Sequence, residues 1–399
     1  MVVHKYGGSS VATIEKIENI AKHLKKIYES GEKIVVVVSA MGKTTNALIA
    51  KAHEITTNPN LRELDRLMSI GENQTIALLA IALNNIGVPS ISLTGEQIPI
   101  ITKGVHTKNI IETINTNKID KLLSEGKIVV VAGFQGINNM GDVTTLGRGG
   151  SDTTAVALAA ALKCKCEIYT DVDGIYRIDP RIYEKATKIK TIQYNEMMEL
   201  AYLGAGVMEP RAIELGYKYS VPIYVGKSLG EKNGTNIVKE CKMEEQEITG
   251  ISVNSNTLMV TIDGIATYAR NLEPIFKKIS ELGINIDIIS QNDVISENGS
   301  IAFTTARTDE NLLNKLFSSL KMGTDVKVLI NKNVAKVSLV VIGIMTHGSV
   351  VAKIFEILMD NNLSFHQIST SEISISLIVN ENIATKVAEL LAQKFKIGG

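Results

Sequence analysis

Apolar and polar positions follow two distinct patterns over about the first 235 residues. Residues 34–38, 128–132, 168–170 and 223–225 are short, largely β-branched apolar runs, as in strands buried inside a parallel sheet. Between residues 14 and 27, apolar side chains recur at three- and four-residue steps, which predicts an amphipathic helix. Strands that alternate with helices predict an αβα sandwich around a mostly parallel sheet, with functional sites at the carboxyl ends of the strands.

From about residue 248, closely spaced strands and helices form a pattern that occurs twice at one constant offset. Each copy reads as a small ferredoxin-like βαββαβ unit. The matching positions are Gly264 and Gly343, Ile275 and Ile354, and Ile289 and Ile368. A long period that occurs twice indicates a duplicated domain rather than a solenoid.

The polar stretch 239–247 separates the two halves. We therefore expect an α/β domain over residues 1–238, a first small domain over 248–327 and a second over 328–399. The strand near 248–255 can instead pair into the second small domain. Because the small domains contain no catalytic-looking cluster, they either sense a small molecule or only hold subunits together.

Composition and charge argue against nucleic-acid-binding, membrane and secreted proteins. The 42 Lys and Arg residues balance the 42 Asp and Glu residues, so no electrostatic footprint for nucleic acid or a membrane surface is present. Apolar runs are strand-length and one begins at Val2, so we expect neither a bilayer span nor a signal peptide. Cys164, Cys166 and Cys241 do not make a zinc set and are expected as reduced thiols in the cytoplasm.

A lysine precedes paired glycines directly after the first apolar run. Gly7 and Gly8 let backbone N–H groups close around an anion, and a buried ammonium at Lys5 requires an anionic partner. A glycine turn alone usually reflects tight packing, but with the lysine it favours a phosphate site. Residues 42–44, Gly-Lys-Thr, resemble the end of a P-loop, yet the first glycine of that motif would fall at Val37 inside a strand, so we exclude a P-loop. Protein-kinase signatures are also absent.

The loop over residues 144–152 is the most informative. Three glycines surround Arg148, so backbone amides and a guanidinium face the same small volume. An arginine in this setting suits bidentate recognition of a carboxylate or phosphate. Ser151 or Asp152 is expected to cap the alanine-rich helix 155–161; capping alone would explain Ser151 but not Arg148.

A further polar loop follows the strand at 168–170. Its Asp173-Gly174 pair alone is a plain turn. Tyr176 and Arg181, further along the loop, suit the base and the phosphates of a nucleotide.

These loops, in this order, closely resemble those of aspartate kinases in the amino-acid-kinase superfamily. The matching sequences are KYGGSSV (5–11), VVVSAMG (36–42), GE (71–72), VAGFQG (131–136), TTLGRGGSD (144–152) and YTDVDGIYRIDPR (169–181). The second half resembles the paired ACT domains of the same enzymes, including STSEISISL at 369–377. The resemblance covers nearly the whole chain, and KYGGSS together with TTLGRGGSD is specific. It implies the carbamate-kinase-like αβα sandwich followed by two ACT domains.

The resemblance also implies a reaction and roles. An aspartate kinase moves the γ-phosphoryl of ATP onto the β-carboxylate of L-aspartate, giving 4-phospho-L-aspartate and ADP, the first step toward lysine, threonine and methionine. Catalysis would rest on Lys5, Arg148 and Asp152, with Asp152 orienting Lys5. ATP, as its Mg²⁺ complex, would contact Lys5, Tyr6, Gly7, Gly8, Ser9, Thr170, Asp171, Tyr176 and Arg181. The aspartate pocket would comprise Ser39, Thr45, Glu72, Phe134, Arg148 and Ser151. No metal-binding side chain and no tightly bound cofactor are expected.

The chemistry agrees with these roles. A β-carboxylate with a pKa near ~4 is already ionised at neutral pH, so it attacks phosphorus without a general base. The obstacle is repulsion, since two like charges ~4 Å apart cost about 4 kcal/mol at an effective dielectric of ~20. Fixed cations and preorganised amides offset that repulsion. Arg148 suits the α-carboxylate of an amino acid and Glu72 suits its α-ammonium.

By the same resemblance, a feedback inhibitor binds between the ACT copies, and lysine, alone or with threonine, is expected. The repeat places residues 291–293 and 370–372 at one equivalent position, where amide, hydroxyl and carboxylate groups recur. The expected effector residues are Asn285, Asp287, Gln291, Asn292, Asp293, Ser369, Thr370, Ser371 and Glu372. The expected assembly is a homodimer or homotetramer through the ACT domains.

Two departures from the family pattern leave alternatives open. Gly206 stands where relatives usually carry a lysine near the nucleotide, and Glu209 where a histidine is common; Lys227 is a candidate substitute for the lysine. The effector loop of the first ACT copy, residues 267–270, also departs from the usual DKPG-like sequence. Another carboxylate or carbamate kinase, or a catalytically inactive amino-acid sensor, are the competing hypotheses.

Overall fold

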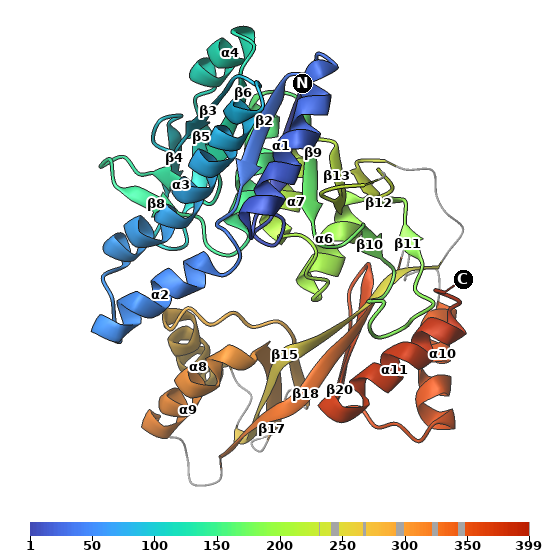
Figure 1. The fold of residues 1–399 in the computed structure, drawn as a ribbon. Helices are drawn as coiled ribbons and strands as arrows, with labels where there is room; N and C mark the ends of the chain where they lie inside the picture. The colour runs from blue at the N-terminus through green and yellow to red at the C-terminus, as the bar shows by residue number, and fades with distance from the viewer. Residues whose placement is uncertain are drawn as a thin grey trace. The chain divides into compact units, whose positions relative to one another are not determined.

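The apolar runs of the first half form the centre of a mostly parallel sheet (Figure 1). Strands β1 (Val2–Tyr6), β2 (Ile34–Val38) and β6 (Ile128–Ala132) are buried along their whole length, because both faces of the sheet are covered. The strand order is β12-β14-β13-β9-β1-β2-β6-β3, in which β13 and β14 pair antiparallel. The mixed α/β class and the mostly parallel sheet predicted from the sequence are confirmed.

The computed structural model describes residues 1–230, 232–240, 247–265, 269–292, 299–320, 326–341 and 348–398; of residues 269, 270 and 292 it describes the backbone. These residues form two compact units. The first comprises residues 1–175, 188–201 and 206–244, and the second comprises 176–187, 202–205 and 245–399.

The remaining elements of the first half have the following bounds. The large sheet also contains β3 (Ser90–Leu93), β9 (Lys165–Thr170), β12 (Thr191–Gln193), β13 (Ile223–Lys227) and β14 (Thr235–Val238). A second sheet, of order β5-β4-β7-β8, contains β4 (Ile100–Lys103), β5 (Ile110–Ile114), β7 (Gln135–Ile137) and β8 (Val143–Thr145). The strands β10 (Ile175–Tyr176) and β11 (Lys188–Ile189) flank residues 177–187. The helices are α1 (Ile14–Glu29), α2 (Thr44–Ile55), α3 (Leu61–Asn85), α4 (Asn117–Ser124), α5 (Gly150–Ala161), α6 (Tyr194–Tyr202) and α7 (Pro210–Tyr219).

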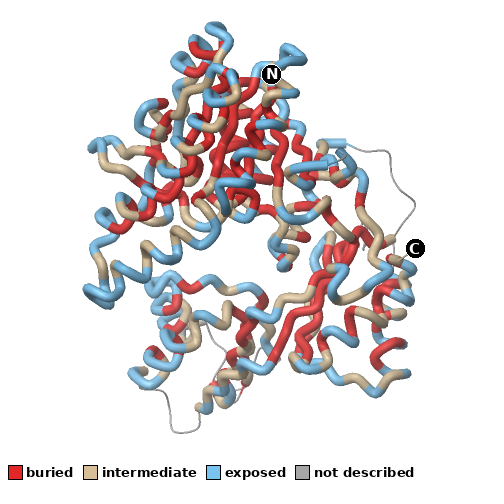
Figure 2. Tube along the Cα trace, viewed as in Figure 1, coloured by how far each residue is buried: buried red, intermediate tan, exposed pale blue. Residues whose placement is uncertain are grey.

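Helices cover both faces of the large sheet. Ile20 of α1 and Leu79 of α3 pack with Val36 and Val130 in one core, and the buried residues of Figure 2 gather along these strands. Side chains alternate along a strand, so Tyr6 faces α1 whereas Lys5 faces the opposite layer, which contains α5. This alternation directs Lys5 toward the first turn of α5.

The start of α5 differs from the sequence prediction. The helix begins at Gly150 and its N-cap is Gly149, which is left-handed with φ 63° and makes no side-chain capping bond. Ser151 and Asp152 lie inside the first turn, so the prediction that either caps the helix is wrong. Glycine takes the cap because the chain reaches the helix through a left-handed residue. Both polar side chains are therefore free to face the cavity described below.

The second half forms one antiparallel sheet of order β16-β17-β15-β18-β20-β19. Its strands are β15 (Ile248–Ile265), β16 (Ile289–Asn292), β17 (Gly299–Ala306), β18 (Lys327–Val341), β19 (Gln367–Thr370) and β20 (Ser374–Asn380), and its helices are α8 (Ala269–Glu281), η1 (Arg307–Asp309), α9 (Glu310–Ser319), α10 (Gly348–Asp360) and α11 (Glu381–Lys394). The matched isoleucines Ile275 and Ile354 are both buried, in α8 and α10. Gly343, the partner of Gly264 in the repeat, lies outside the described residues.

Two long strands pass through both copies of the repeat. Residues 248–254 of β15 pair with 336–341 of β18, and residues 259–263 pair with 327–331. The register shifts between these two stretches. One core contains Val260 and Phe303, and a separate core contains Val337 and Leu377. The domain boundaries expected from the sequence stay a prediction.

The segment 176–187 belongs to the second unit although it precedes that unit's sheet in the chain. Its Arg177 is buried, and the guanidinium donates hydrogen bonds to the carbonyls of Ile248 (3.0 Å) and Thr249 (3.2 Å). Cys164 and Cys166 are free thiols, and Cys241 lies outside the described residues. None of the helices in the described ranges is long and apolar enough to span a bilayer.

Candidate active site

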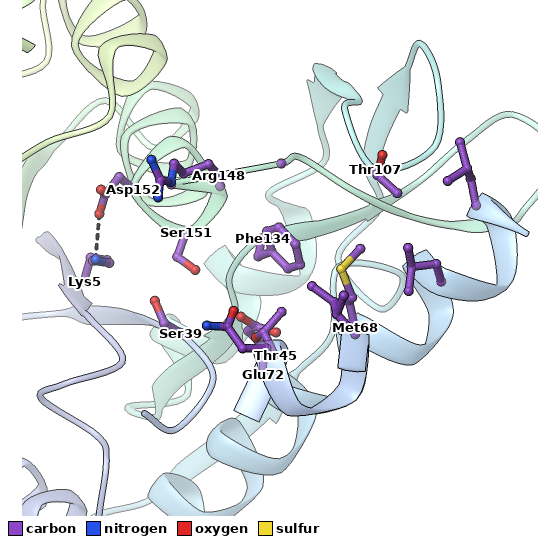
Figure 3. A pocket seen from close by; sticks show the side chains of 17 residues that line it. Lys5, Ser39, Thr45, Met68, Glu72, Thr107, Phe134, Arg148, Ser151 and Asp152 are labelled. Carbon is purple, nitrogen blue, oxygen red and sulfur yellow. Dashed lines mark ion pairs between the residues drawn. The ribbon is translucent and has the colours of Figure 1, made fainter. Parts of the chain in front are cut away.

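A cavity of about 520 Å³ lies where β1, β2 and β6 end (Figure 3). Charged and polar side chains from five segments of the chain meet there. They are Lys5, Ser39, Thr45, Asn46, Glu72, Thr107, Arg148, Ser151 and Asp152. The structure thus brings together the residues that the sequence assigned to catalysis and to the aspartate pocket, with Phe134 among them.

Lys5 and Asp152 form the charged end of the cavity. The Lys5 ammonium lies 2.7 Å from Asp152 Oδ1, and both side chains are about nine-tenths buried. A buried ammonium is held in place by such a carboxylate, which leaves further N–H bonds of Lys5 for another anion. Lys5 is therefore fixed in orientation rather than free to turn into solvent.

The glycine loop after β1 packs closely on the turn after β2. A Cβ atom at Gly8 would lie 2.9 Å from the Ala40 carbonyl oxygen, so a larger residue does not fit. Gly7 donates its N–H to the Tyr169 carbonyl (3.1 Å), whereas within the described ranges the Gly8 N–H has no partner. α1 begins only at Ile14, after a further turn and a Thr13 cap. The Gly8 N–H is thus one amide of this loop that a ligand can engage.

Glu72 of α3 is buried at the opposite wall from Arg148. Its Oε1 accepts the Ala40 N–H (3.0 Å), and no hydrogen bond reaches Oε2 from the part of the chain that is described. Burial raises the pKa of Glu72 to about 7, and its backbone hydrogen bonds oppose the shift. A buried carboxylate oxygen without a donor favours a cationic ligand, because an ammonium both satisfies it and stabilises its charge.

Phe134 adopts an unusual backbone conformation at the floor of the cavity. Its φ is 70°, which is rare for a bulky residue. The Phe134 N–H donates to Thr154 Oγ1 (3.1 Å) and its carbonyl accepts the Leu146 N–H (3.0 Å), which hold this conformation. Strained residues of this kind concentrate at functional sites.

Arg148 is exposed, and among the described residues no carboxylate or carbonyl engages its guanidinium. Glu209, the residue directly before α7, packs against Gly149. Burial, the neighbouring Asp152 carboxylate and other charges together raise the pKa of Glu209, although Arg211 and Arg148 act in the other direction. The Arg148 fork is thus available to an anionic ligand.

The nucleotide residues proposed from the sequence are not gathered in the same way. The Tyr6 ring is fully buried and stacks on Tyr169 at 5.1 Å, so only its backbone is open to a ligand. Thr170 donates its hydroxyl hydrogen to Asp171 Oδ1 (2.9 Å) at an exposed position. Tyr176 and Arg181 belong to the second unit, where the Arg181 guanidinium pairs with Asp179 at 2.6 Å. Ser9 accepts a hydrogen bond from Lys16 at its carbonyl (2.8 Å).

Several of the proposed effector residues have partners of their own. Asp287 forms an ion pair with Lys336, whose side chain is almost fully buried. The Ser371 hydroxyl accepts the N–H groups of Ile373 and Ser374, as in a turn. The Asn285 carbonyl accepts the Thr305 hydroxyl (2.8 Å). Asp293 and the Asn292 side chain lie outside what the structure describes.

The sequence reasoning missed one wall of the cavity. Ile49 of α2 and Leu61, Leu64 and Met68 of α3 also line the cavity, and Met68 lies on the side away from Lys5 (Figure 3). The spacing of the three α3 residues is that of one helix face, a signal the sequence did contain. The hydrogen bonds that Asp65 makes with Thr107, and Arg211 with Asn109, carried no such signal in the sequence.

Comparisons with known proteins bear on the family and the fold of this chain. Residues 1–227 match the amino acid kinase family, and residues 337–395 match an ACT domain. The aspartokinase of Geobacillus stearothermophilus is 44% identical over 397 residues, 99% of this chain and 97% of that protein. The aspartokinase of Bacillus sp. strain MGA3 is 43% identical over 402 residues, 100% of this chain and 98% of that protein.

Solved structures share the fold. E. coli aspartokinase III in complex with aspartate and ADP matches 99% of both chains with a TM-score of 0.82 at 24% identity. The same enzyme in complex with lysine and aspartate matches with a TM-score of 0.77 at 24% identity, over 99% of both chains. The family match over more than half of the chain and the full-length relatives decide the classification. The chain belongs to the aspartokinases of the amino acid kinase family and is a phosphotransferase with a C-terminal ACT region.

Proposed function

We propose that this protein transfers the γ-phosphoryl group of ATP to the β-carboxylate of L-aspartate. The observation that carries the proposal is the arrangement of opposite charges in the cavity. Glu72 and Arg148 lie on facing walls, while Lys5 and Asp152 occupy the end next to the glycine loop (Figure 3). An α-amino acid with a second carboxylate presents the complementary charges to these three points.

In the proposed reaction, the α-ammonium pairs with Glu72 and the α-carboxylate with the Arg148 fork. The β-carboxylate, ionised without a base, attacks the γ-phosphorus. The new O–P bond forms as the bond from the γ-phosphorus to the β,γ-bridging oxygen breaks, and ADP departs with those electrons. Lys5 and the Gly8 N–H offset charge on the phosphoryl oxygens, with Asp152 orienting Lys5.

Mg²⁺ would enter with ATP as part of the substrate complex, since this ion is held largely by phosphate oxygens and water. Thr170, Asp171, Tyr176 and Arg181 remain the proposed residues for the rest of the nucleotide. The product, an acyl phosphate, is the activated form from which lysine, threonine and methionine can be built.

The test measures ADP formation with aspartate, glutamate and other carboxylates in turn, and traps the acyl phosphate with hydroxylamine. We expect turnover with aspartate and a hydroxamate in equal amount. Preference for another carboxylate or for carbamate would make the chain a different kinase of the family. ATP and aspartate binding without turnover would make it a sensor.

We further propose that the ACT region binds an amino-acid inhibitor, lysine alone or with threonine, in a homodimer or homotetramer. Gln291 and Thr370, which the repeat places at one equivalent position, are both exposed and support this. Glu372 is exposed and has no ion-pair partner in the described ranges, whereas Asp287 is already engaged by Lys336. Inhibition assays with lysine, threonine and methionine, singly and in pairs, together with the mass in solution, test both statements. If none of them inhibits, the ACT region is structural.

A further inference from the structure

Two loops that lie far apart in the sequence meet beside Arg148. One spans residues 104–109, between β4 and β5, and the other runs from Thr145, the last residue of β8, to Gly149, before α5. The Asn109 N–H donates to the Thr145 carbonyl (3.0 Å), and Gly147 approaches the Thr107 carbonyl so closely that a Cβ there would lie 3.2 Å away. Arg148 is exposed and has no side-chain partner in the described structure, so the backbone of these loops sets the point from which its side chain reaches into the cavity.

The backbone of the loop that carries Arg148 has little conformational preference of its own. Gly147 and Gly149 flank it with φ values of 79° and 63°, conformations that glycine enters readily and leaves as readily. A loop of this kind holds a side chain in one place only when neighbouring groups fix its backbone. A buried carboxylate from α3 and a partly buried guanidinium from α7 supply such groups.

Asp65 of α3 holds the first side of the junction. It is fully buried, and its two oxygens accept the Thr107 N–H at 3.0 and 3.1 Å and contact His106 Nδ1 at 2.6 Å. The Thr145 hydroxyl also donates to Asp65. Thr107, which lines the cavity, has a φ of 72°, so the carboxylate stabilises a backbone conformation that threonine rarely adopts.

Arg211 of α7 holds the second side. Its Nη1 donates to the Leu146 carbonyl (2.8 Å), two residues before Arg148, and its Nη2 donates to the Asn109 carbonyl (3.0 Å). One planar guanidinium therefore joins both loops, which a single ammonium cannot do with the same geometry. Hydrogen bonds from a charged donor are also stronger than neutral ones.

We propose that Arg211, together with Asp65, positions the Arg148 guanidinium and so sets the affinity of the site for the amino-acid substrate rather than for ATP. Neither residue touches substrate in this arrangement; both act through the loop backbone. The proposal rests on the proposed function, in which Arg148 binds the α-carboxylate. A small displacement of this loop would move the Arg148 guanidinium away from the α-carboxylate of the substrate. Lys5 and Asp152 would stay in place.

The test compares Arg211→Met and Arg211→Lys with wild type, and uses Arg66→Met, an exposed arginine of α3, as the matched control. Loss of two charge-assisted bonds should raise the KM for aspartate by about 10-fold or more in Arg211→Met. Arg211→Lys should recover part of that loss. In a third variant, Arg211→Ala, which leaves space for the ion, added guanidinium should lower the KM for aspartate. The KM for ATP should stay within about twofold throughout. The control should match wild type in both constants.

A second readout does not depend on activity. Hydrogen exchange at the amides of residues 145–149 should be faster in Arg211→Met than in wild type, with the exchange of β1 and β2 unchanged. Asp65→Asn, which keeps an acceptor for the Thr107 N–H, should show the same two signatures if Arg211→Met proves unstable.

Three outcomes would overturn the proposal. An equal rise in both KM values would mean that Arg211 contacts the nucleotide or only stabilises the fold. Unchanged exchange at 145–149 would mean that the loop does not depend on Arg211. An unchanged KM for aspartate would separate Arg211 from substrate binding. By contrast, a wild-type protein without aspartate-dependent ADP formation refutes the proposed function, whatever the exchange experiment shows.

Discussion

At the scale of single residues, Glu72 has the most informative environment in the cavity. Burial raises its pKa from the ordinary 4.5 to about 7, so near neutral pH the empty site holds a mixture of ionised and protonated carboxyl groups. Only the ionised form pairs with an ammonium. We therefore expect kcat/KM for aspartate to fall as the pH drops through about 7.

The same shift has a consequence for stability. A carboxyl whose pKa is raised on folding stabilises the protein below its unfolded pKa of 4.5, and that contribution is lost as the pH rises through about 7. Glu72→Gln keeps an oxygen for the Ala40 N–H and never ionises. It should raise Tm at alkaline pH, by an amount equivalent to at most about 3 kcal/mol, and leave Tm nearly unchanged at acidic pH, while the KM for aspartate rises.

Calorimetry across pH, alongside steady-state kinetics, checks this prediction. A lower Tm for Glu72→Gln at alkaline pH would mean that the ionised carboxylate stabilises the empty site. A KM for aspartate unchanged from wild type would remove Glu72 from substrate binding.

Lys5 allows a second test at this scale. Its ammonium is buried against Asp152, on the strand face directed at α5. Lys5→Met should lower kcat by at least ~100-fold, because a contact to the transferring phosphoryl is lost. Circular dichroism should show a folded protein. A variant that retains half of the wild-type kcat would exclude Lys5 from the mechanism.

At the scale of elements, the sequence predicted strands and helices well and their junctions less well. The run at 34–38 was correctly predicted as a buried strand, because five consecutive β-branched residues disfavour a helix or a loop. The predicted N-cap of α5 was wrong. Both Ser151 and a left-handed glycine at 149 suit an N-cap, and only the path by which the loop enters the helix decides between them. Local preference therefore identified the element but not its first residue.

The cavity shows a similar division. Lys5 and Arg148 could be chosen from their own chemistry, because a buried ammonium and a guanidinium among glycines both suit an anion, whereas Glu72 and Asp152 were assigned through the resemblance to aspartate kinases. The hydrogen bond between Arg211 and Asn109 joins residues about a hundred positions apart, and the sequence around neither residue predicts it. Pairings of this kind follow from how two loops fold against each other, so they become visible only in three dimensions.

The loop before α7 yields the next prediction. Gly206 stands where the resemblance to aspartate kinases leads us to expect a lysine, and a Cβ atom there would meet no other atom within 4 Å. We expect Gly206→Lys to fold normally and to lower the KM for ATP or leave it unchanged, because the space for the side chain is open. Parallel kinetics on Lys227→Ala show whether that lysine supplies the missing contact. A raised KM for ATP in Gly206→Lys would mean that the nucleotide itself needs the space.

At the scale of the whole molecule, the proposed inhibition would couple the ACT region to a cavity whose residues belong to the other unit. Such coupling typically amounts to about 1–3 kcal/mol. Ser371 maintains its own turn through Ile373 and Ser374, so its substitution would disturb structure as well as binding. Glu372, exposed beside it, is the cleaner position to change.

Glu372→Ala should raise the inhibitor concentration needed for half-inhibition several-fold and leave the uninhibited kcat near wild type. Lys394→Ala, which removes an exposed partner of Glu356 in the same region, serves as the control. Equal effects of the two substitutions would point to a general loosening of the region. No effect of Glu372→Ala would place the effector elsewhere.

The passage of β15 and β18 through both copies of the repeat has a consequence for how this region can change over time. Residues 328–331 of β18 complete the sheet of the first copy, and residues 248–254 of β15 complete that of the second. A cut between residues 327 and 328 would therefore leave each fragment with an unpaired edge. Because the two copies share these strands, we expect the region to unfold in one cooperative transition, to resist exchange of its halves between relatives, and to be gained or lost by a kinase only as a whole.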